Sequence, residues 1–182
     1  MSQRTLDFVM VFEDHHDALR VQEVLPKFSR FGLTLHPTKT RLVPFRASKD
    51  GSDDPPPGSF DFLGFTHDWG TSRYGSDWPM RKTAESRYNR AIKALNQWMR
   101  GARHLPVEAQ AKTLGQKLRG HFGYYGIAGN SRSIARFSHF ARRLWKKWLC
   151  RRSQRAYVSW DAFKRLVAKD PLPPPRLRRQ AT

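Results

Sequence analysis

The clearest candidate for chemistry in this sequence is a dense run of cationic side chains with aromatic residues between them. A guanidinium group forks onto phosphate oxygens, and an exposed aromatic ring stacks on an unpaired base. No acidic residue interrupts the run, so its cations have no acidic neighbour within the run with which to form ion pairs. The pattern therefore indicates a polyanion-binding helix. Its cations are Arg132, Arg136, Arg142, Arg143, Lys146, Lys147, Arg151, Arg152 and Arg155, and its aromatic residues are Trp145, Trp148, Tyr157 and Trp160.

The charge of the whole chain is equally uneven. The 182 residues carry a formal net charge of +19. Residues 81–182 hold 25 Lys and Arg against 4 Asp and Glu, whereas residues 1–80 hold 9 against 11. A charge of this size draws a protein to polyanions, with nucleic acid as the first candidate and an anionic membrane surface as the second. Charge alone does not separate RNA from DNA.

Several classes of protein are disfavoured by what the sequence lacks. A single cysteine, Cys150, excludes an internal disulfide and suits a reducing cytosol. The N-terminus has no apolar segment of signal-peptide length, and no apolar run approaches the roughly 18 residues of a membrane span. His15, His16 and His36 have no convergent carboxylate or thiol partner in the pattern, so we expect no zinc site. The sequence predicts a soluble, cytoplasmic protein.

The first 80 residues carry short strand signals and one helix signal. Asp14 is a plausible N-cap of a helix that ends at Gly32, with Pro26 marking a boundary inside it. Apolar residues at helical spacing, Ala18, Val21, Leu25 and Phe28, predict its buried face. Strands are expected at residues 8–12, 33–35, 41–45 and 60–65, a loop at 48–59, and a hairpin or an irregular segment at 69–78.

After residue 80 the apolar spacing becomes helical. Four helices are predicted, capped or begun by Thr83, Pro106, Ser131 or Ser133, and Ser159. Leu144 and Trp148 share an apolar stripe, so at least half of the tryptophans should be core. Order is expected to end at Pro171. The buried stripes are Tyr88, Ile92, Leu95 and Met99; Ala111, Leu114 and Leu118; Ile134, Phe137, Ala141, Leu144 and Trp148; and Phe163, Leu166 and Val167.

Four segments, in this order along the chain, resemble motifs of the group II intron reverse transcriptase/maturase family. Residues 8–12 resemble the strand after the polymerase aspartates, and residues 32–40 resemble the next palm motif. Residues 60–65 resemble the primer-gripping motif. Residues 117–127, with Gly129 and Asn130, resemble the maturase-specific (X, or thumb) domain, and the likeness continues from Trp145 to Trp160.

The resemblance implies an α+β fold, a partial palm sheet followed by a basic bundle of three to four helices. It implies three parts: a truncated palm at 1–80, the maturase-specific domain at 81–170, and a disordered basic tail at 171–182. It also implies roles for particular residues. Lys39, Leu63 and Gly64 would lie near the nucleotide or primer, and Arg119, His121, Tyr124 and Tyr125 would join the cationic run in RNA contact.

The resemblance also implies that a two-metal polymerase site is incomplete. Relatives place paired aspartates before the first palm strand and a third carboxylate far upstream, which together hold two Mg²⁺. Here Arg4 and Leu6 replace the family's Tyr and first Asp, and only Asp7 remains, as a vestige. We expect no polymerase activity from this chain alone and no cofactor for it, although an intact relative would use Mg²⁺.

The expected function is that of a truncated maturase, which binds structured intron RNA and assists its folding and splicing. Three alternatives stay open. The chain could be the C-terminal piece of a split RNA-directed DNA polymerase, whose upstream fingers/palm fragment docks on residues 8–12. It could be a non-functional remnant. It could also be a general basic binder of DNA or anionic membrane, which the ordered motifs disfavour.

Overall fold

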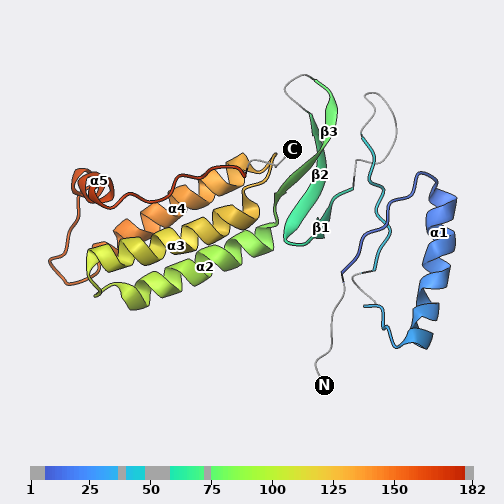
Figure 1. Cartoon of the computed structure of the whole chain (residues 1–182), viewed down its shortest axis with the longest axis horizontal. Coiled ribbons are helices and arrows are strands. Elements are labelled where there is room, and N and C mark those ends of the chain that lie inside the picture. Colours follow the sequence, from blue (N-terminus) through green and yellow to red (C-terminus); the bar gives the residue numbers. More distant parts are fainter. Residues whose placement is uncertain (1–6, 37–39, 48–57, 72–74, 179–182) are drawn as a thin grey trace. The chain divides into compact units, whose positions relative to one another are not determined.

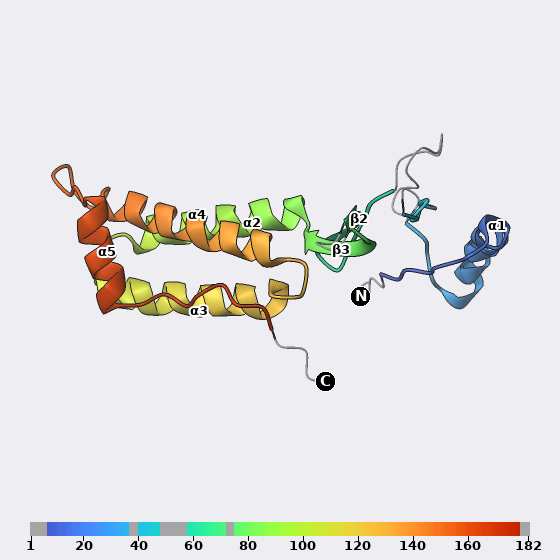
Figure 2. The ribbon, with the colours of Figure 1, turned by 90° about the horizontal axis from the view of Figure 1, so that it is seen from above.

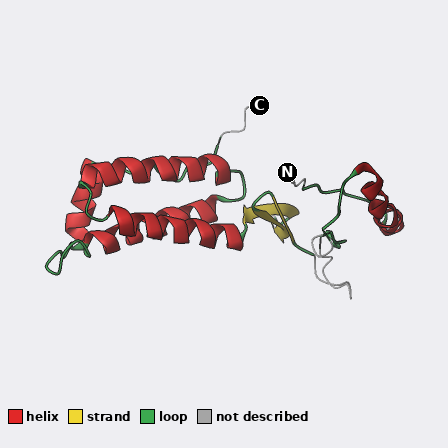
Figure 3. Cartoon of the chain, turned by 90° about the horizontal axis from the view of Figure 1, so that it is seen from below, coloured by secondary structure: helices red, strands yellow, loops and turns green. Residues whose placement is uncertain are grey.

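The computed structural model describes residues 7–36, 40–47, 58–71 and 75–178. The chain divides into two compact units, one of residues Met1–Leu63 and His67–Pro79, the other of Gly64–Thr66 and Met80–Thr182. Both helices and strands are present (Figure 1), which confirms the α+β class. Figure 3 shows that the described strands form one small sheet and that helices make up most of the second unit.

The helix of the first unit follows its predicted signals closely. Helix α1 (His15–Val24) begins after Asp14, whose side chain accepts a hydrogen bond from the His16 amide at 2.7 Å. A 3-10 helix, η1 (Leu25–Phe31), follows directly with Pro26 in its first turn, where the missing N–H of proline interrupts the α-helical hydrogen bonds. Gly32 ends it with a φ of 71°, in the left-handed region that favours glycine.

Three of the predicted strands in this unit are wrong. Residues 8–12, 33–35 and 41–45 are described, but none of them belongs to a strand. Each of the five side chains of residues 8–12 is at least 36% exposed. A strand exists only when its backbone pairs with a neighbour, and an apolar run cannot supply that partner by itself. Whether this unit is a remnant of a polymerase palm stays a prediction.

The sheet is built from two successive hairpins. Its strands β1 (Phe60–Phe62), β2 (Phe65–Thr71) and β3 (Asp77–Thr83) lie in the order β1-β2-β3. The single strand predicted at 60–65 is interrupted by a turn at Leu63 and Gly64, with φ values of 48° and 83°. Two consecutive positive φ values suit a tight two-residue hairpin turn. The predicted hairpin at 69–78 corresponds to β2 and β3, whereas most of the predicted loop at 48–59 lies outside the described residues.

The second unit is a bundle of helices. Three helices lie side by side: α2 (Glu85–Ala102), α3 (Val107–Tyr125) and α4 (Ser131–Leu149). A fourth helix, α5 (Trp160–Lys169), crosses the end of this bundle at which α4 ends (Figure 2). The predicted stripes meet in one core, in which Leu114, Leu118 and Ala141 are fully buried. Full burial of such a leucine contributes roughly 1.5–3 kcal/mol.

The predicted helix starts are right in two cases and wrong in two. Pro106 occupies the N-cap position of α3, and the Ser159 hydroxyl accepts the Ala162 amide of α5 at 3.1 Å. Thr83, however, is the last residue of β3, and Ala84 precedes α2. Neither Ser131 nor Ser133 caps α4, because Asn130 occupies that position.

The C-terminal segment corrects the prediction that order ends at Pro171. Residues 171–178 are described, and Leu172 is only 6% exposed within the core. The segment runs back along α3 (Figure 2), where Pro173 approaches Gly115 and the Arg178 amide donates to the Gly126 carbonyl. An apolar residue between prolines can thus complete a core without regular secondary structure. Residues 179–182 lie outside the described part of the chain.

Candidate nucleic-acid interface

Helix α4 is fixed in the bundle by tryptophans on its inner face. Trp145 is fully buried, and its indole N–H donates to the Gln110 side-chain oxygen of α3 at 3.0 Å. The Trp148 indole donates to the Asn96 side-chain oxygen of α2 at 2.9 Å. Together with Ile134, Phe137 and Ala141, these rings bind α4 to both neighbouring helices. The prediction that at least half of the aromatic run's tryptophans are core is confirmed.

The outer face of α4 is cationic along its length. Exposed cations follow one another at intervals of four, seven and four residues, spacings that keep side chains on one side of a helix. By helical rise they extend over about 22 Å. We call this set the cationic ridge: Arg132, Arg136, Arg143 and Lys147.

Two ridge cations rest on aromatic rings. The Arg136 guanidinium lies over the Tyr88 ring of α2 at 4.8 Å from its centroid, and also 5.9 Å from that of Phe140. The Lys147 ammonium lies 5.5 Å from the Trp148 ring. Such cation–π contacts hold a long side chain in place while its charged group stays accessible. The ridge is therefore partly ordered before any ligand arrives.

The other predicted cations of the run have different surroundings. Arg142 and Lys146 are half-buried rather than exposed. Arg152 donates to the Leu105 carbonyl at 2.9 Å, and so ties the loop after α4 to the turn between α2 and α3. Arg151 lies over Trp148, whereas Arg155 is exposed in the loop.

His121 belongs to a packing corner at the end of α3. Its imidazole stacks on Phe137 with centroids 3.6 Å apart and lies 4.7 Å from the Tyr125 ring. Burial lowers the pKa of His121 from 6.5 to about 4, so the ring carries no charge near neutral pH. His121 was predicted to bind RNA, but its neutral ring cannot form an ion pair with a phosphate near neutral pH.

The two tyrosines of the same corner differ in exposure. Tyr125 packs edge-on against Phe65, and burial raises its pKa. Its hydroxyl lies 3.2 Å from the place where a Cβ on Gly64 would be, so a larger residue at position 64 would crowd this tyrosine. Tyr124 stacks on Phe65 but is 54% exposed, which leaves one part of its ring open to a ligand.

The remaining predicted positions lie outside α4. Arg119 lines a small hollow on α3 together with Glu108 and Asp170. Leu63 and Gly64 form the β1–β2 turn, and their proposed contact with a primer stays a prediction. Lys39 lies outside the described residues. The described residues contain no cluster of three or more His, Cys, Asp or Glu side chains suited to a metal ion, and Asp7 is exposed.

Sequence reasoning missed the polar residues that hold the bundle. Asn130 is 1% exposed; its oxygen accepts the Thr83 amide, and its NH₂ group donates to the Thr83 hydroxyl and the Tyr125 carbonyl, all within 2.9 Å. Gln110 is 3% exposed, and besides accepting from Trp145 it donates to the Leu105 carbonyl at 2.8 Å. Asn130 was noted only as part of the resemblance to the maturase-specific domain, and the signal for Gln110 was a polar residue beside an apolar stripe.

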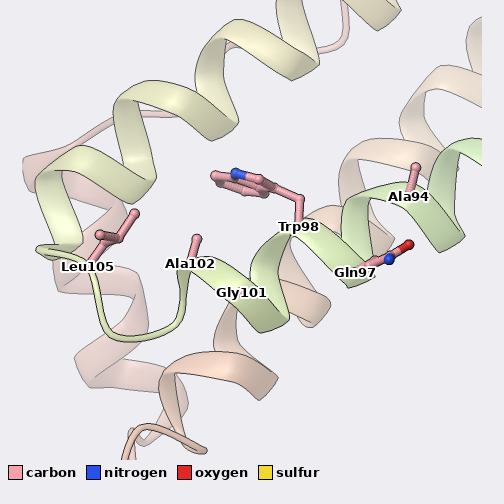
Figure 4. Close-up of a pocket in the computed structure, with 6 residues that line it drawn as sticks. All are labelled: Ala94, Gln97, Trp98, Gly101, Ala102 and Leu105. Atoms are coloured by element: carbon pink, nitrogen blue, oxygen red, sulfur yellow. The ribbon is translucent and has the colours of Figure 1, made fainter.

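A groove on α2 contains none of the predicted RNA-binding residues. It has a volume of about 580 Å³ and is lined mostly by apolar side chains. Figure 4 shows Trp98 projecting from α2 across it, and the Lys117 ammonium lies 5.3 Å from that ring. The lining residues are Ala94, Gln97, Trp98, Gly101, Ala102 and Leu105. Among the described helices, none is long and apolar enough to span a membrane.

Comparison with known proteins identifies the helical unit. Residues 79–166 match the family described as the group II intron maturase-specific domain. No curated protein and no solved structure gives a significant match to the chain. The matched residues include all of α2, α3 and α4 and most of α5. The match confirms the resemblance to group II intron maturases seen in the sequence, and it supports a maturase-related role in intron splicing for the matched residues.

Proposed function

We propose that this chain binds structured intron RNA through the cationic ridge of α4 and thereby assists RNA folding and splicing. The observation that carries the proposal is the ridge itself, four exposed cations on one side of a helix without an acidic residue. Residues 81–182 hold only four acids, and two of these, Asp161 and Glu108, form ion pairs with Lys164 and Lys169. Little in this unit competes with phosphates for the ridge.

The geometry of the ridge suits recognition of the backbone of duplex RNA rather than recognition of particular bases. Double-stranded RNA is read mostly through its phosphates and 2′-hydroxyls, because its deep major groove excludes side chains. A straight row of guanidinium and ammonium groups follows a backbone without contacting base edges. Tighter binding to the compact RNA than to its unfolded form shifts the population towards the splicing-competent state without protein catalysis.

The test is a charge reversal restricted to the ridge. Arg132, Arg136, Arg143 and Lys147 are changed together to Glu, and affinity for a folded group II intron RNA is measured by filter binding. We expect a loss of about a hundredfold or more, since four phosphate contacts become four repulsions. Arg142 and Lys146 are left unchanged because both are half-buried, and replacing them would disturb packing.

A charge-matched control separates the ridge from overall charge. The same number of exposed cations on α2 and α3 is reversed in Lys93, Arg100, Lys112 and Lys117. This variant should lose much less affinity than the ridge variant. An equal loss in both would show that only net charge matters, and equal affinity of the unchanged chain for intron RNA and a scrambled duplex of equal length would reject the maturase role.

A second candidate function rests on the exposed apolar residues 8–12. Val11 is 87% exposed and Phe8 is 43% exposed, so this segment offers apolar surface to another polypeptide. An upstream polymerase fragment that added a strand here would restore a reverse transcriptase, with Mg²⁺ supplied to a carboxylate set including Asp7. Primer extension with Mg²⁺ tests this: we expect no product from the chain alone, and product after addition of the fragment.

A further inference from the structure

Two aromatic rings that follow α4 are largely exposed to solvent, although their burial would stabilise the fold. Tyr157 is 80% exposed and Trp160 is 51% exposed, whereas Trp145 and Trp148 of the same cationic run are buried. Leaving large rings in water forgoes the hydrophobic stabilisation that their burial would supply. Exposed aromatic side chains of this kind are frequent where a ligand stacks.

Both rings face the same cation. The Lys146 ammonium lies 4.7 Å from the Trp160 ring and 5.6 Å from the Tyr157 ring. Lys146 thereby connects the last turn of α4 to the loop and to the first residue of α5. The rings and the ammonium form one cluster, which we call the Tyr157 cluster: Lys146, Tyr157 and Trp160.

The loop that carries Tyr157 is fixed at both ends. The Cys150 thiol group exchanges hydrogen bonds with Val158, accepting its amide at 3.4 Å and donating to its carbonyl at 3.6 Å. Ser159 then caps α5, and the Trp160 ring packs edge-on against buried Phe163 with centroids 5.9 Å apart. The loop backbone and the Trp160 ring are thus held in place before a ligand binds, which reduces the entropy lost on binding.

The surroundings of the cluster select an anionic ligand. Arg151, Arg152 and Arg155 lie in the same loop, and no acid occurs between Asn130 and Asp161. Asp161 itself is paired with Lys164 at 3.4 Å. A flat ring system attached to a phosphate satisfies both features, because the ring stacks on the aromatic side chains and the phosphate neutralises the ammonium.

We propose that the Tyr157 cluster is a stacking site for an unpaired nucleotide of the bound RNA. The base lies on the ring of Tyr157 or Trp160, and the Lys146 ammonium turns to the adjoining phosphate. The inference rests on the proposed RNA binding and extends it, since the ridge grips paired phosphates whereas the cluster requires a base outside the duplex. It gives the domain a preference for bulges and strand ends.

The experiment compares two RNA hairpins, one perfectly paired and one with a single bulged adenosine. The full chain should bind the bulged RNA about fivefold or more tightly, in line with the measured cost of removing one base–aromatic stack. Replacing Tyr157 and Trp160 together by Leu should abolish this preference and leave affinity for the paired hairpin unchanged. Trp78→Leu is the matched control, because Trp78 is also exposed, at 63%, and should keep the preference.

The outcomes separate this proposal from the proposed function. Reversal of the ridge charges should weaken binding of both hairpins alike. Equal binding of the two hairpins by the unchanged chain, or a preference that survives loss of both rings, would overturn the stacking site while leaving ridge binding intact. The stacking site is also rejected if the double variant loses only self-association, measured by light scattering, and keeps its RNA binding. A bulged 4-thiouridine that crosslinks to the Tyr157–Trp160 peptide would support the site directly.

Discussion

The imidazole of His121 lies between Phe137 and Tyr125, and burial there lowers its pKa from 6.5 to about 4. Because the folded state prefers the neutral ring, the unfolded chain takes up a proton first as pH falls. Stability is therefore unaffected by this group above about pH 6.5 and is lost progressively between pH 6.5 and 4. The corner of the bundle at His121 is thus acid-sensitive.

Replacement of His121 by Phe tests this directly. The aromatic ring is retained and the titration is removed, so the free energy of unfolding should become less dependent on pH between 6.5 and 4. The expected difference is about 1 kcal/mol, less than the full shift because the ring is partly accessible. Urea unfolding over that pH range measures it. His139→Gln, at an exposed position of α4, serves as control, and an identical change there would contradict the assignment.

Asn130 joins three parts of the second unit through one buried amide. Its contacts reach Thr83 before α2 and Tyr125 at the end of α3, while its backbone precedes α4. Asn130→Ala leaves the buried Thr83 amide without this acceptor, and we expect a loss of about 2–3 kcal/mol in unfolding free energy. Asn89→Ala, on the exposed side of α2, should change stability by less than about 0.5 kcal/mol. Similar values for both variants would disprove the role of Asn130.

At the scale of elements, helical periodicity predicted more than any other signal. The stripes through Leu95, Leu118 and Ala141 identified core positions because a bundle buries the apolar side of each helix. Strand signals failed at residues 8–12 because pairing depends on a neighbour that local sequence does not specify. The cationic ridge could be found from spacing, but the half-burial of Arg142 and Lys146 depends on how α4 is rotated, which the buried Trp145 decides.

The C-terminal segment is an element that composition alone misjudged. Prolines flank Leu172, yet this side chain fills a place in the core of the bundle. Leu172→Ala should lower the unfolding free energy by about 2–3 kcal/mol through lost burial and the resulting cavity. Thermal and urea unfolding give the value. Leu177→Ala, at a position 42% exposed in the same segment, should cost well under half as much, and equal effects would mean that Leu172 is not a core residue.

At the scale of the whole molecule, charge should govern how binding responds to salt. Each phosphate neutralised releases counterions, so four ridge contacts predict about a hundredfold loss of RNA affinity between roughly 50 and 200 mM salt. The ridge variant should show a much shallower dependence. Fluorescence anisotropy across a salt series measures both slopes. An affinity of the unchanged chain that stays flat over this range would reject phosphate contacts as the basis of binding.

The absence of acids on α4 also affects the free protein. Arg132 and Arg136, Arg142 and Lys146, and Arg143 and Lys147 are like-charge neighbours four residues apart, and each such pair costs a helix roughly 0.2–0.5 kcal/mol. Arg132 also lies in the first turn, where the helix dipole disfavours a cation. An RNA that neutralises the ridge removes this internal repulsion. If α4 binds intron RNA as proposed, the phosphates would supply the missing counter-charge and raise the stability of the helix that binds them.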